Sequence, residues 1–199
     1  MDIGVFGGTF DPLHIGHLII AEEARLSLGL SQVIFVPAGE PWLKEHRIIS
    51  PGEQRLEMIQ LAIASNPFFR ASTVDLERPG PSYTVDTLAD LRRELGEEAN
   101  SYLILGLDAL AEFSTWREPD RILEMCHLVA ARRPEVRDLE LESLEGSIPG
   151  ISRRVLILDN SLIDISSSDI RNRVAEGLPI RYLVPEAVER YIREQGLYL

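Results

Sequence analysis

Cysteine is almost absent from this sequence of 199 residues, which contains only Cys126. A single thiol excludes an internal disulfide and a zinc site built from several cysteines, and it suits a reducing cytoplasm, where we expect the protein. The simplest interpretation of Cys126 is a small buried hydrophobic side chain. Long apolar runs are also missing, since the longest are far shorter than the ~20 residues of a membrane-spanning helix. The first residues do not resemble a signal peptide.

Positive charge is scarce as well. The chain has 20 Lys and Arg against 32 Asp and Glu, which gives a formal net charge of −12. Such a balance argues against a general electrostatic attraction to nucleic acid or anionic lipid, so we expect neither as a partner. Any bound polyanion must be held by a local cluster of donors. The length and the 45% hydrophobic content predict one soluble domain, residues 1–199.

Short apolar runs rich in Val and Ile alternate with helical patterns along the chain. Because runs that are apolar on both faces are typical of covered parallel strands, they predict an α/β fold. We expect a doubly wound, Rossmann-like parallel sheet with helices on both faces and a small C-terminal helical part. Its ligand crevice should lie at the carboxyl ends of the strands. The five runs are residues 3–6, 33–36, 102–105, 128–131 and 155–158.

Glycine and proline mark the ends of the expected helices. Gly29 should end the helix that follows the first strand, and Gly96 a later one. Ser50 is expected to cap a helix whose first residue is Pro51. Residues 134–153 are acidic and lack clear periodicity, so they predict a solvated connection.

The turn after the first strand is the most informative stretch, with the sequence GGTFDPLHIGH over residues 7–17. Gly7 and Gly8 let the backbone turn sharply and approach a ligand closely. The helix that follows offers unpaired N–H groups and the positive end of its dipole, which suit phosphate. Neither the dinucleotide pattern G-x-G-x-x-G nor the Walker pattern is present.

His14 and His17 are three residues apart, so at a helix start they lie on neighbouring positions of one face. They are suited to act together on one ligand, and Gly16 between them permits a flat base or ribose to lie against the turn. Two histidines bonded to backbone groups are the alternative. Zinc binding lacks further ligands and the H-E-x-x-H arrangement.

Residues 7–12 and 14–17 resemble the signature of the nucleotidylyltransferase superfamily, whose [HT]-x-G-H element binds the triphosphate of ATP. The same HIGH letters occur in class I aminoacyl-tRNA synthetases, but those need a longer chain and a lysine loop that is absent here. Residues 165–171, ISSSDIR, resemble a second element of the superfamily, I-S-S-[ST]-x-I-R. Ser167 or Ser168 can cap a helix there, so that Arg171 reaches an anion at the helix start.

The resemblance implies His14, His17 and Arg171 as the catalytic residues. It also implies a set of ATP-binding residues from the two motifs, namely Gly7, Gly8, Thr9, Phe10, Gly16, Ser166, Ser167 and Ser168. Lys44 follows a partial match to another element of the family, P-P-H-[KR], and is carried over as a phosphate contact. A solvated loop lysine is the alternative for Lys44.

The middle of the chain is similar to the bacterial nicotinate-nucleotide adenylyltransferase family in residues 81–88, in residues 106–110 and at Trp116. The resemblance implies that Trp116 stacks on the pyridine ring and that Tyr83 and Thr84 offer donors to the nicotinate carboxylate. For Trp116 the alternative is a core aromatic side chain, and for Thr84 a helix cap. It further implies Asp108 in the nucleotide site, on a ribose hydroxyl or a metal-bound water, and Arg133 on the acceptor phosphate.

The implied reaction transfers the adenylyl group of ATP to nicotinate mononucleotide, giving nicotinate adenine dinucleotide and pyrophosphate, a step of NAD biosynthesis. Mg²⁺ would bridge phosphate oxygens rather than occupy a protein cage. The expected partners are therefore ATP and nicotinate mononucleotide, and the chain is a monomer or a homodimer. Transfer to nicotinamide mononucleotide, transfer to phosphopantetheine and a non-catalytic nucleotide sensor remain as alternatives.

Overall fold

The computed structural model describes residues 1–40, 49–96, 98–132 and 141–199. Within them the chain forms a six-stranded sheet whose paired neighbours are all parallel, in the order β3-β2-β1-β4-β5-β6. This is the doubly wound order: the chain adds β2 and β3 on one side of β1 and then β4, β5 and β6 on its other side. The strands are β1 (Asp2–Gly8), β2 (Gln32–Pro37), β3 (Phe69–Ala71), β4 (Asn100–Gly106), β5 (Cys126–Ala131) and β6 (Val155–Leu158).

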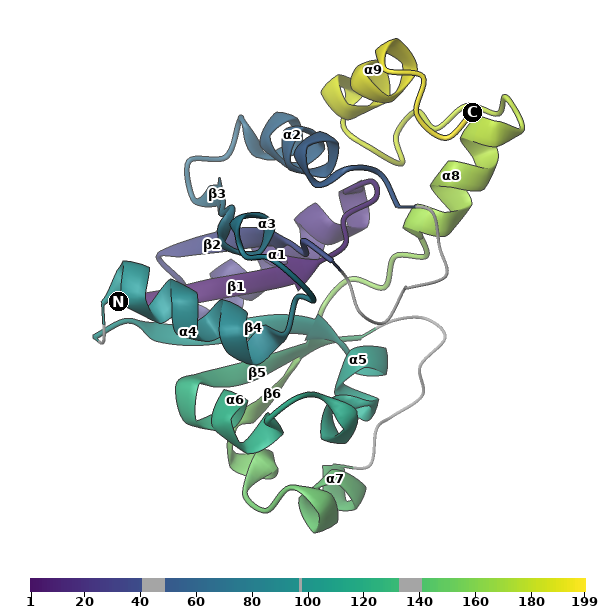
Figure 1. The fold of residues 1–199 in the computed structure, drawn as a ribbon. Helices are drawn as coiled ribbons and strands as arrows, with labels where there is room; N and C mark the ends of the chain where they lie inside the picture. The colour runs from purple at the N-terminus through teal and green to yellow at the C-terminus, as the bar shows by residue number, and fades with distance from the viewer. Residues whose placement is uncertain (41–48, 97, 133–140) are drawn as a thin grey trace.

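Helices connect the strands and cover both faces of the sheet (Figure 1). The predicted α/β fold is therefore confirmed. The helices are α1 (Ile15–Leu28), α2 (Gly52–Ile63), α3 (Val74–Glu77), α4 (Thr84–Leu95), α5 (Leu107–Ala111), α6 (Pro119–Met125), α7 (Leu141–Ser147), α8 (Ser167–Ala175) and α9 (Glu186–Glu194), with 3-10 turns η2 (Phe113–Thr115) and η3 (Ile151–Arg153).

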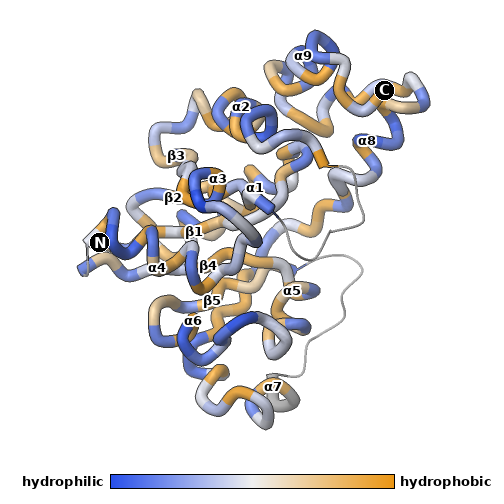
Figure 2. The backbone as a smooth tube through the Cα atoms, viewed as in Figure 1, coloured by the Kyte–Doolittle hydropathy of each residue, from blue (hydrophilic) through white to orange (hydrophobic). Residues whose placement is uncertain are grey.

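Two apolar cores lie on opposite faces of the sheet. On one face, side chains such as Val5 and Leu103 pack against Leu88 of α4 and Ile122 of α6. On the other face, the strand residues that alternate in sequence with those of the first core pack against α1 and α2. Figure 2 shows the central strands as largely hydrophobic, because both of their faces are covered.

A third core joins the C-terminal helices to the rest of the chain. Met58 of α2 packs with Ile170 of α8 and with Val188 and Ile192 of α9. Figure 1 shows α8 and α9 beside α2, away from the strands. The expected small C-terminal helical part is thus present. It contacts α2 and lies next to the turn that follows β1.

The five expected strands are all present, and the sixth, β3, was not predicted. It has only three residues, all half-buried, which is too short to show a pattern. Gly29 ends α1 in the left-handed region at φ 63°, as expected. The predicted cap of α2 is wrong: the helix begins at Gly52, Pro51 is its N-cap, and no side chain caps it.

The prediction of a solvated connection over residues 134–153 is wrong for the described part, 141–153. Leu144, Ile148 and Ile151 are buried there and join the core beneath α7 and η3. Their spacing of four and three residues is a helical signal that the surrounding acidic residues obscured. The rest of the segment lies outside the described residues. Among the residues that the structure describes, no helix has the length and apolar content to cross a membrane.

Candidate active site

A pocket of about 530 Å³ opens at the carboxyl ends of β1 and β4, where the order of the strands reverses. Most of the site residues expected from the sequence line it, although they come from distant segments. These residues are Gly7, Gly8, Thr9, Phe10, His14, His17, Thr84, Asp108, Trp116, Ser166, Ser167, Ser168 and Arg171.

Four expected residues do not line the described pocket. Gly16 is buried under His14, where a Cβ would meet the imidazole Nδ1 at 3.1 Å. Tyr83 is the N-cap residue of α4, and the guanidinium of Arg117 lies 4.7 Å from the centre of its ring. Lys44 and Arg133 lie outside the described residues.

The turn after β1 leaves backbone exposed to the pocket. A Cβ at Gly7 would meet no atom within 4 Å, so glycine keeps the main chain open to a ligand there. At Gly8 a Cβ would approach the ring of Phe10 to 3.0 Å, and Phe10 itself has a φ of 49°. Gly8 is therefore needed so that the Phe10 ring can fold back onto the turn.

The two histidines at the start of α1 form a stacked pair, with ring centres 3.7 Å apart. The backbone N–H of His14 donates to Nδ1 of His17 over 3.2 Å. In the neutral imidazole this bond places the hydrogen of His17 on Nε2, so that Nε2 is a hydrogen-bond donor. The rings of Phe6 and Phe10 pack edge-on against the His17 ring and fix its orientation.

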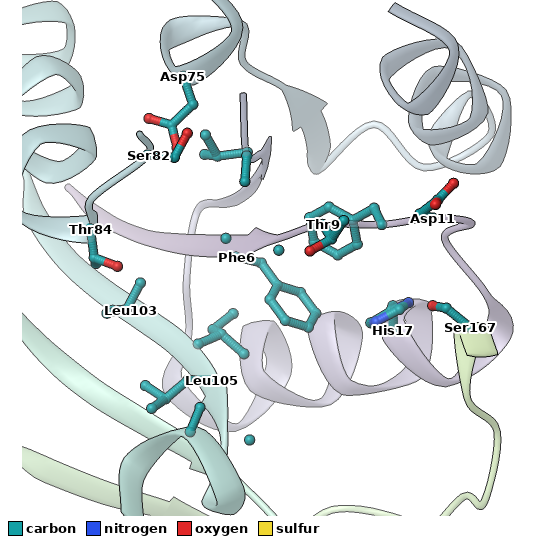
Figure 3. A pocket seen from close by; sticks show the side chains of 18 of the residues that line it. Phe6, Thr9, Asp11, His17, Asp75, Ser82, Thr84, Leu103, Leu105 and Ser167 are labelled. Carbon is teal, nitrogen blue, oxygen red and sulfur yellow. The ribbon is translucent and has the colours of Figure 1, made fainter. Parts of the chain in front are cut away.

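Helix α8 brings the second motif to the same place. Its N-cap is Ser166, whose Oγ accepts from the N–H of Asp169 over 3.0 Å, so the expected cap at Ser167 or Ser168 is wrong. Ser167 instead donates to the carbonyl of Pro12 over 2.9 Å. Figure 3 shows Ser167 beside His17, so the N-termini of α1 and α8 meet at one end of the pocket.

Arg171 connects α8 to the glycine-rich turn. Its Nη1 donates to the carbonyl of Asp11 over 2.7 Å, and its Nη2 donates to Oγ of Ser168 over 3.1 Å. The guanidinium also borders the pocket. It is therefore a cation held at the place where the two helix N-termini converge, which is a suitable arrangement for a polyphosphate.

The other end of the pocket contains two polar residues that sequence reasoning missed, Asp75 and Ser82. Figure 3 shows them there together with the expected Thr84, and it shows the apolar side chains of Phe6, Leu103 and Leu105 along the same pocket. The hydroxyl of Ser82 accepts from the N–H of Gly39 over 2.8 Å, which ties the ends of two loops together.

Asp75 is buried beside Thr87, whose hydroxyl donates to its carboxylate over 2.6 Å. Burial raises the pKa of Asp75, against the opposing effects of Thr87 and Arg78. Glu112 and Trp116 also line the pocket, and the half-buried indole of Trp116 packs on Phe113 with ring centres 5.3 Å apart. No motif marked Asp75 or Glu112, since single acidic residues are common on helix surfaces.

Arg55 of α2 is a buried cation that the sequence analysis also missed. It is 1% exposed, and burial lowers its pKa. Its guanidinium donates to four main-chain carbonyls, those of Thr9, Ala38, Gly39 and Ser50. The side chain therefore holds together the turns that follow β1 and β2. Its spacing of four residues from the buried Ile59 is the signal that places it on the inner face of α2.

Metal ligation by the protein alone is not indicated in the described part of the chain. Within residues 1–40, 49–96, 98–132 and 141–199 no three His, Cys, Asp or Glu side chains are grouped so as to hold a metal ion. A divalent cation in this pocket would take its ligands mainly from a bound phosphate.

Comparison with known proteins gives consistent results. The family model described as cytidylyltransferase-like matches residues 5–173. A probable nicotinate-nucleotide adenylyltransferase of Roseiflexus sp. (strain RS-1) is 49% identical over 196 residues, covering 98% of this chain and 97% of that protein. A protein of the same description from Moorella thermoacetica is 47% identical over 197 residues, covering 98% of this chain and 91% of the other.

Among solved structures, the nicotinic acid mononucleotide adenylyltransferase of Plasmodium falciparum in complex with NaAD has a similar fold. Its TM-score is 0.80 at 18% identity, covering 99% of this chain and 97% of that one. The fold and the pocket define an enzyme of the nucleotidyltransferase class. Within this class, the chain belongs to the nicotinate-nucleotide adenylyltransferase family.

Proposed function

We propose that this enzyme transfers the adenylyl group of ATP to nicotinate mononucleotide, releasing pyrophosphate and forming nicotinate adenine dinucleotide. The observation that carries the proposal is one pocket with two chemically different ends. One end has two helix N-termini and Arg171, which suit a triphosphate, and the other has Thr84 and Trp116, which suit a flat ring with a carboxylate. Family membership supports the same reaction.

At the triphosphate end, the proposal assigns His14 and His17 as hydrogen-bond donors and Arg171 as the cationic contact. The turn of Gly7, Gly8, Thr9 and Phe10, with Gly16 beneath it, shapes the surface against which the nucleotide lies. Ser166, Ser167 and Ser168 supply the N-terminus of α8. The stacked histidine rings and the contacts of α8 with the turn support this assignment.

At the acceptor end, the proposal assigns Trp116 to stack on the pyridine ring and Tyr83 and Thr84 to donate to its carboxylate. Asp108 contacts the nucleotide from the start of α5. Lys44 and Arg133 remain proposed phosphate contacts. The position of Thr84 at the start of α4 supports a carboxylate there, because the helix N-terminus presents unpaired N–H groups.

The chemistry requires orientation more than proton transfer. A phosphate oxygen of the acceptor forms a bond to the α-phosphorus of ATP, and the bond from that phosphorus to the β-phosphate bridging oxygen breaks. The nucleophile is already an anion at neutral pH, so no general base is needed. Holding both anions in line supplies on the order of 7–11 kcal/mol of the barrier. Mg²⁺ enters as part of the ATP substrate and neutralises phosphate charge.

The compartment and the metal belong to the same proposal. The lone buried cysteine suits the reducing cytoplasm, where we place the reaction. Mg²⁺ is the divalent ion we propose, because it prefers phosphate oxygens and water to an all-protein cage.

The test compares kcat/KM for nicotinate mononucleotide and nicotinamide mononucleotide at saturating Mg-ATP, with chromatographic identification of each dinucleotide. We expect a clear preference for the acid, because the acceptor end offers donors to a carboxylate. A preference for the amide would overturn the acceptor assignment. ATP binding without pyrophosphate release from either acceptor would indicate a nucleotide sensor instead.

A further inference from the structure

Asp11 has an unusual position at the border of the pocket. It is only 3% exposed, and its polar atoms contact three segments that are far apart in the sequence. The hydroxyl of Tyr198 donates to Oδ1 over 2.7 Å, and the N–H of Ser50 donates to Oδ2 over 3.2 Å. The main-chain carbonyl of Asp11 accepts from Nη1 of Arg171 over 2.7 Å. Asp11 therefore contacts both Arg171, the cation that we propose binds phosphate, and the C-terminal segment.

Tyr198 reaches Asp11 from the third core. Its ring packs against the cluster formed by α2, α8 and α9, and its hydroxyl lies 3.8 Å from Sδ of Met58. Burial and the adjacent carboxylate of Asp11 raise the pKa of Tyr198. The phenol therefore keeps its proton throughout the neutral range and remains a donor to Asp11.

We infer that Tyr198 is a positioning residue for ATP binding: its hydroxyl satisfies the carboxylate of Asp11 and so leaves Arg171 to bind the triphosphate. The inference rests on the proposed function only in assigning Arg171 to phosphate. Tyr198 itself does not line the pocket, so it acts through the other two residues.

The physical reason is competition for a cation. A buried carboxylate that loses one of its two donors carries an uncompensated charge, and this favours any guanidinium within reach. Arg171 is already bonded to the carbonyl of Asp11. Among the described residues, the other cation beside Asp11 is Arg55, which uses its guanidinium on four main-chain carbonyls. Without the phenol, Arg171 is thus the cation that the carboxylate draws from the pocket.

The first experiment replaces the hydroxyl alone, in Tyr198→Phe, and measures the Kd of Mg-ATP by calorimetry together with KM for both substrates. We expect the Kd and KM of ATP to rise about five- to tenfold, while the KM of nicotinate mononucleotide stays unchanged. The matched control is Tyr191→Phe, a half-buried tyrosine of the same core. It should leave both constants as in the unsubstituted protein.

Two double-variant cycles separate positioning from a general structural effect. In an Arg171→Ala background, Tyr198→Phe should weaken ATP binding no further, because the residue through which it acts is gone. In an Asp11→Asn background it should also have no effect on the Kd of ATP, since no charge remains to attract Arg171.

Unchanged ATP affinity in folded Tyr198→Phe would overturn the inference. A further rise in the Kd of ATP when Tyr198→Phe is added to Arg171→Ala would also overturn it. Should Tyr198→Phe alone fail to fold, the test is the Kd of ATP in Asp11→Asn with and without Tyr198→Phe. A difference between these two variants would contradict the inference. The Kd of ATP needs no acceptor, so a wrong acceptor assignment shows separately, as ATP binding without transfer to nicotinate mononucleotide.

Discussion

His17 at the first turn is oriented by a backbone group together with neighbouring aromatic rings. The N–H of His14 fixes the tautomer of His17, and the Phe6 and Phe10 rings hold its plane. A donor fixed in this way costs little reorganisation when charge develops on a phosphate. His17 is therefore suited to stabilise the transition state more than the bound substrate.

The substitution His17→Ala tests this role. We expect kcat to fall about 100-fold with a much smaller change in the KM of ATP, because the lost bond is one that strengthens in the transition state. Steady-state kinetics with both substrates varied provide the measurement. Turnover equal to that of the unsubstituted protein at saturating ATP would rule out the assignment.

Cys126 is a residue with a structural effect only. It is 2% exposed, as expected from the sequence, and its Sγ donates to the carbonyl of Ile122 over 3.4 Å. Burial raises the pKa of its thiol from 9.0 to about 12. The folded thiol is consequently un-ionised in the range where the thiol of the unfolded chain ionises.

This shift predicts a loss of stability at alkaline pH. Below pH 9 both states keep the proton, whereas between pH 9 and about 12 only the unfolded state releases it. The free energy of unfolding should therefore decrease as pH rises through that window, by up to about 1.4 kcal/mol per pH unit. Urea unfolding at pH 8, 9 and 10 measures the slope. Cys126→Ala should remove this contribution, and an identical slope in the variant would contradict the prediction.

At the scale of elements, the start of α8 combines two tasks. Ser166 caps the helix through its Oγ, while Ser167 ties the same end to the carbonyl of Pro12. The helix is largely hydrophilic in Figure 2, so its position depends on these bonds and on the buried Ile170. Its N-terminus remains directed at the proposed phosphate end of the pocket.

Two substitutions at Ser166 separate capping from phosphate binding. Ser166→Ala should lower the free energy of unfolding by about 1 kcal/mol, because the N–H of Asp169 loses its acceptor. Ser166→Asp should keep the cap and the stability, yet weaken ATP binding by placing a negative charge beside the triphosphate. Chemical denaturation and ATP calorimetry are the measurements. Equal ATP affinity in both variants would place Ser166 away from the phosphates.

Helix α7 is joined to η3 by one carboxylate. Glu145 accepts from the N–H groups of Gly150 and Ser152, over 2.6 and 3.0 Å, and from the hydroxyl of Ser152. These bonds, with that hydroxyl as the main cause, lower the pKa of Glu145 to about 2. Glu145, one of the acidic residues of this segment, thus holds the backbone on both sides of Ile151.

The prediction for Glu145 concerns acid. A carboxylate with a lowered pKa stabilises the fold fully above about pH 4.5 and loses this effect as pH falls towards about 2. Thermal unfolding of Glu145→Gln should therefore show a lower Tm than the unsubstituted protein at pH 7, with a difference that closes in acid. A constant difference across this range would show that charge plays no part.

At the scale of the whole molecule, a net charge of −12 contrasts with the anionic ligands that we propose. The contrast is resolved by position, since His14, His17, Arg171 and two helix N-termini converge on one pocket. The net negative charge predicts that nucleic acid is not a partner, and this stays a prediction from the sequence. We propose that the phosphate charge beyond what these donors neutralise is balanced by the cation bound to ATP.

Removal of divalent cations tests this division of charge. We expect EDTA to abolish adenylyl transfer while leaving the Tm of the nucleotide-free protein unchanged, because the described residues contain no grouped metal ligands. Activity assays and thermal unfolding with and without added Mg²⁺ measure both effects. A fall in Tm on chelation alone would reveal a structural metal.

The sequence by itself determined the periodic and the motif-bearing parts of this protein. Buried strands show as apolar runs because both faces of a parallel sheet are covered, and the GGTFDPLHIGH and ISSSDIR segments combine glycine, histidine and serine in patterns typical of helix starts that bind phosphate. Both motifs lie on the pocket at the carboxyl ends of the strands, as expected.

Only the tertiary structure decided which solitary polar residues matter. The spacing of Arg55 from Ile59 places it on the inner face of α2 but does not indicate its partners, which are main-chain carbonyls. The partners of Asp75 and Tyr198 include side chains from distant segments. Burial gives each of them its significance: a buried charge or hydroxyl must find a partner, and that partner is set by the packing of the chain rather than by sequence neighbours. The contact of Tyr198 with Asp11 exists because α9 folds back onto α2.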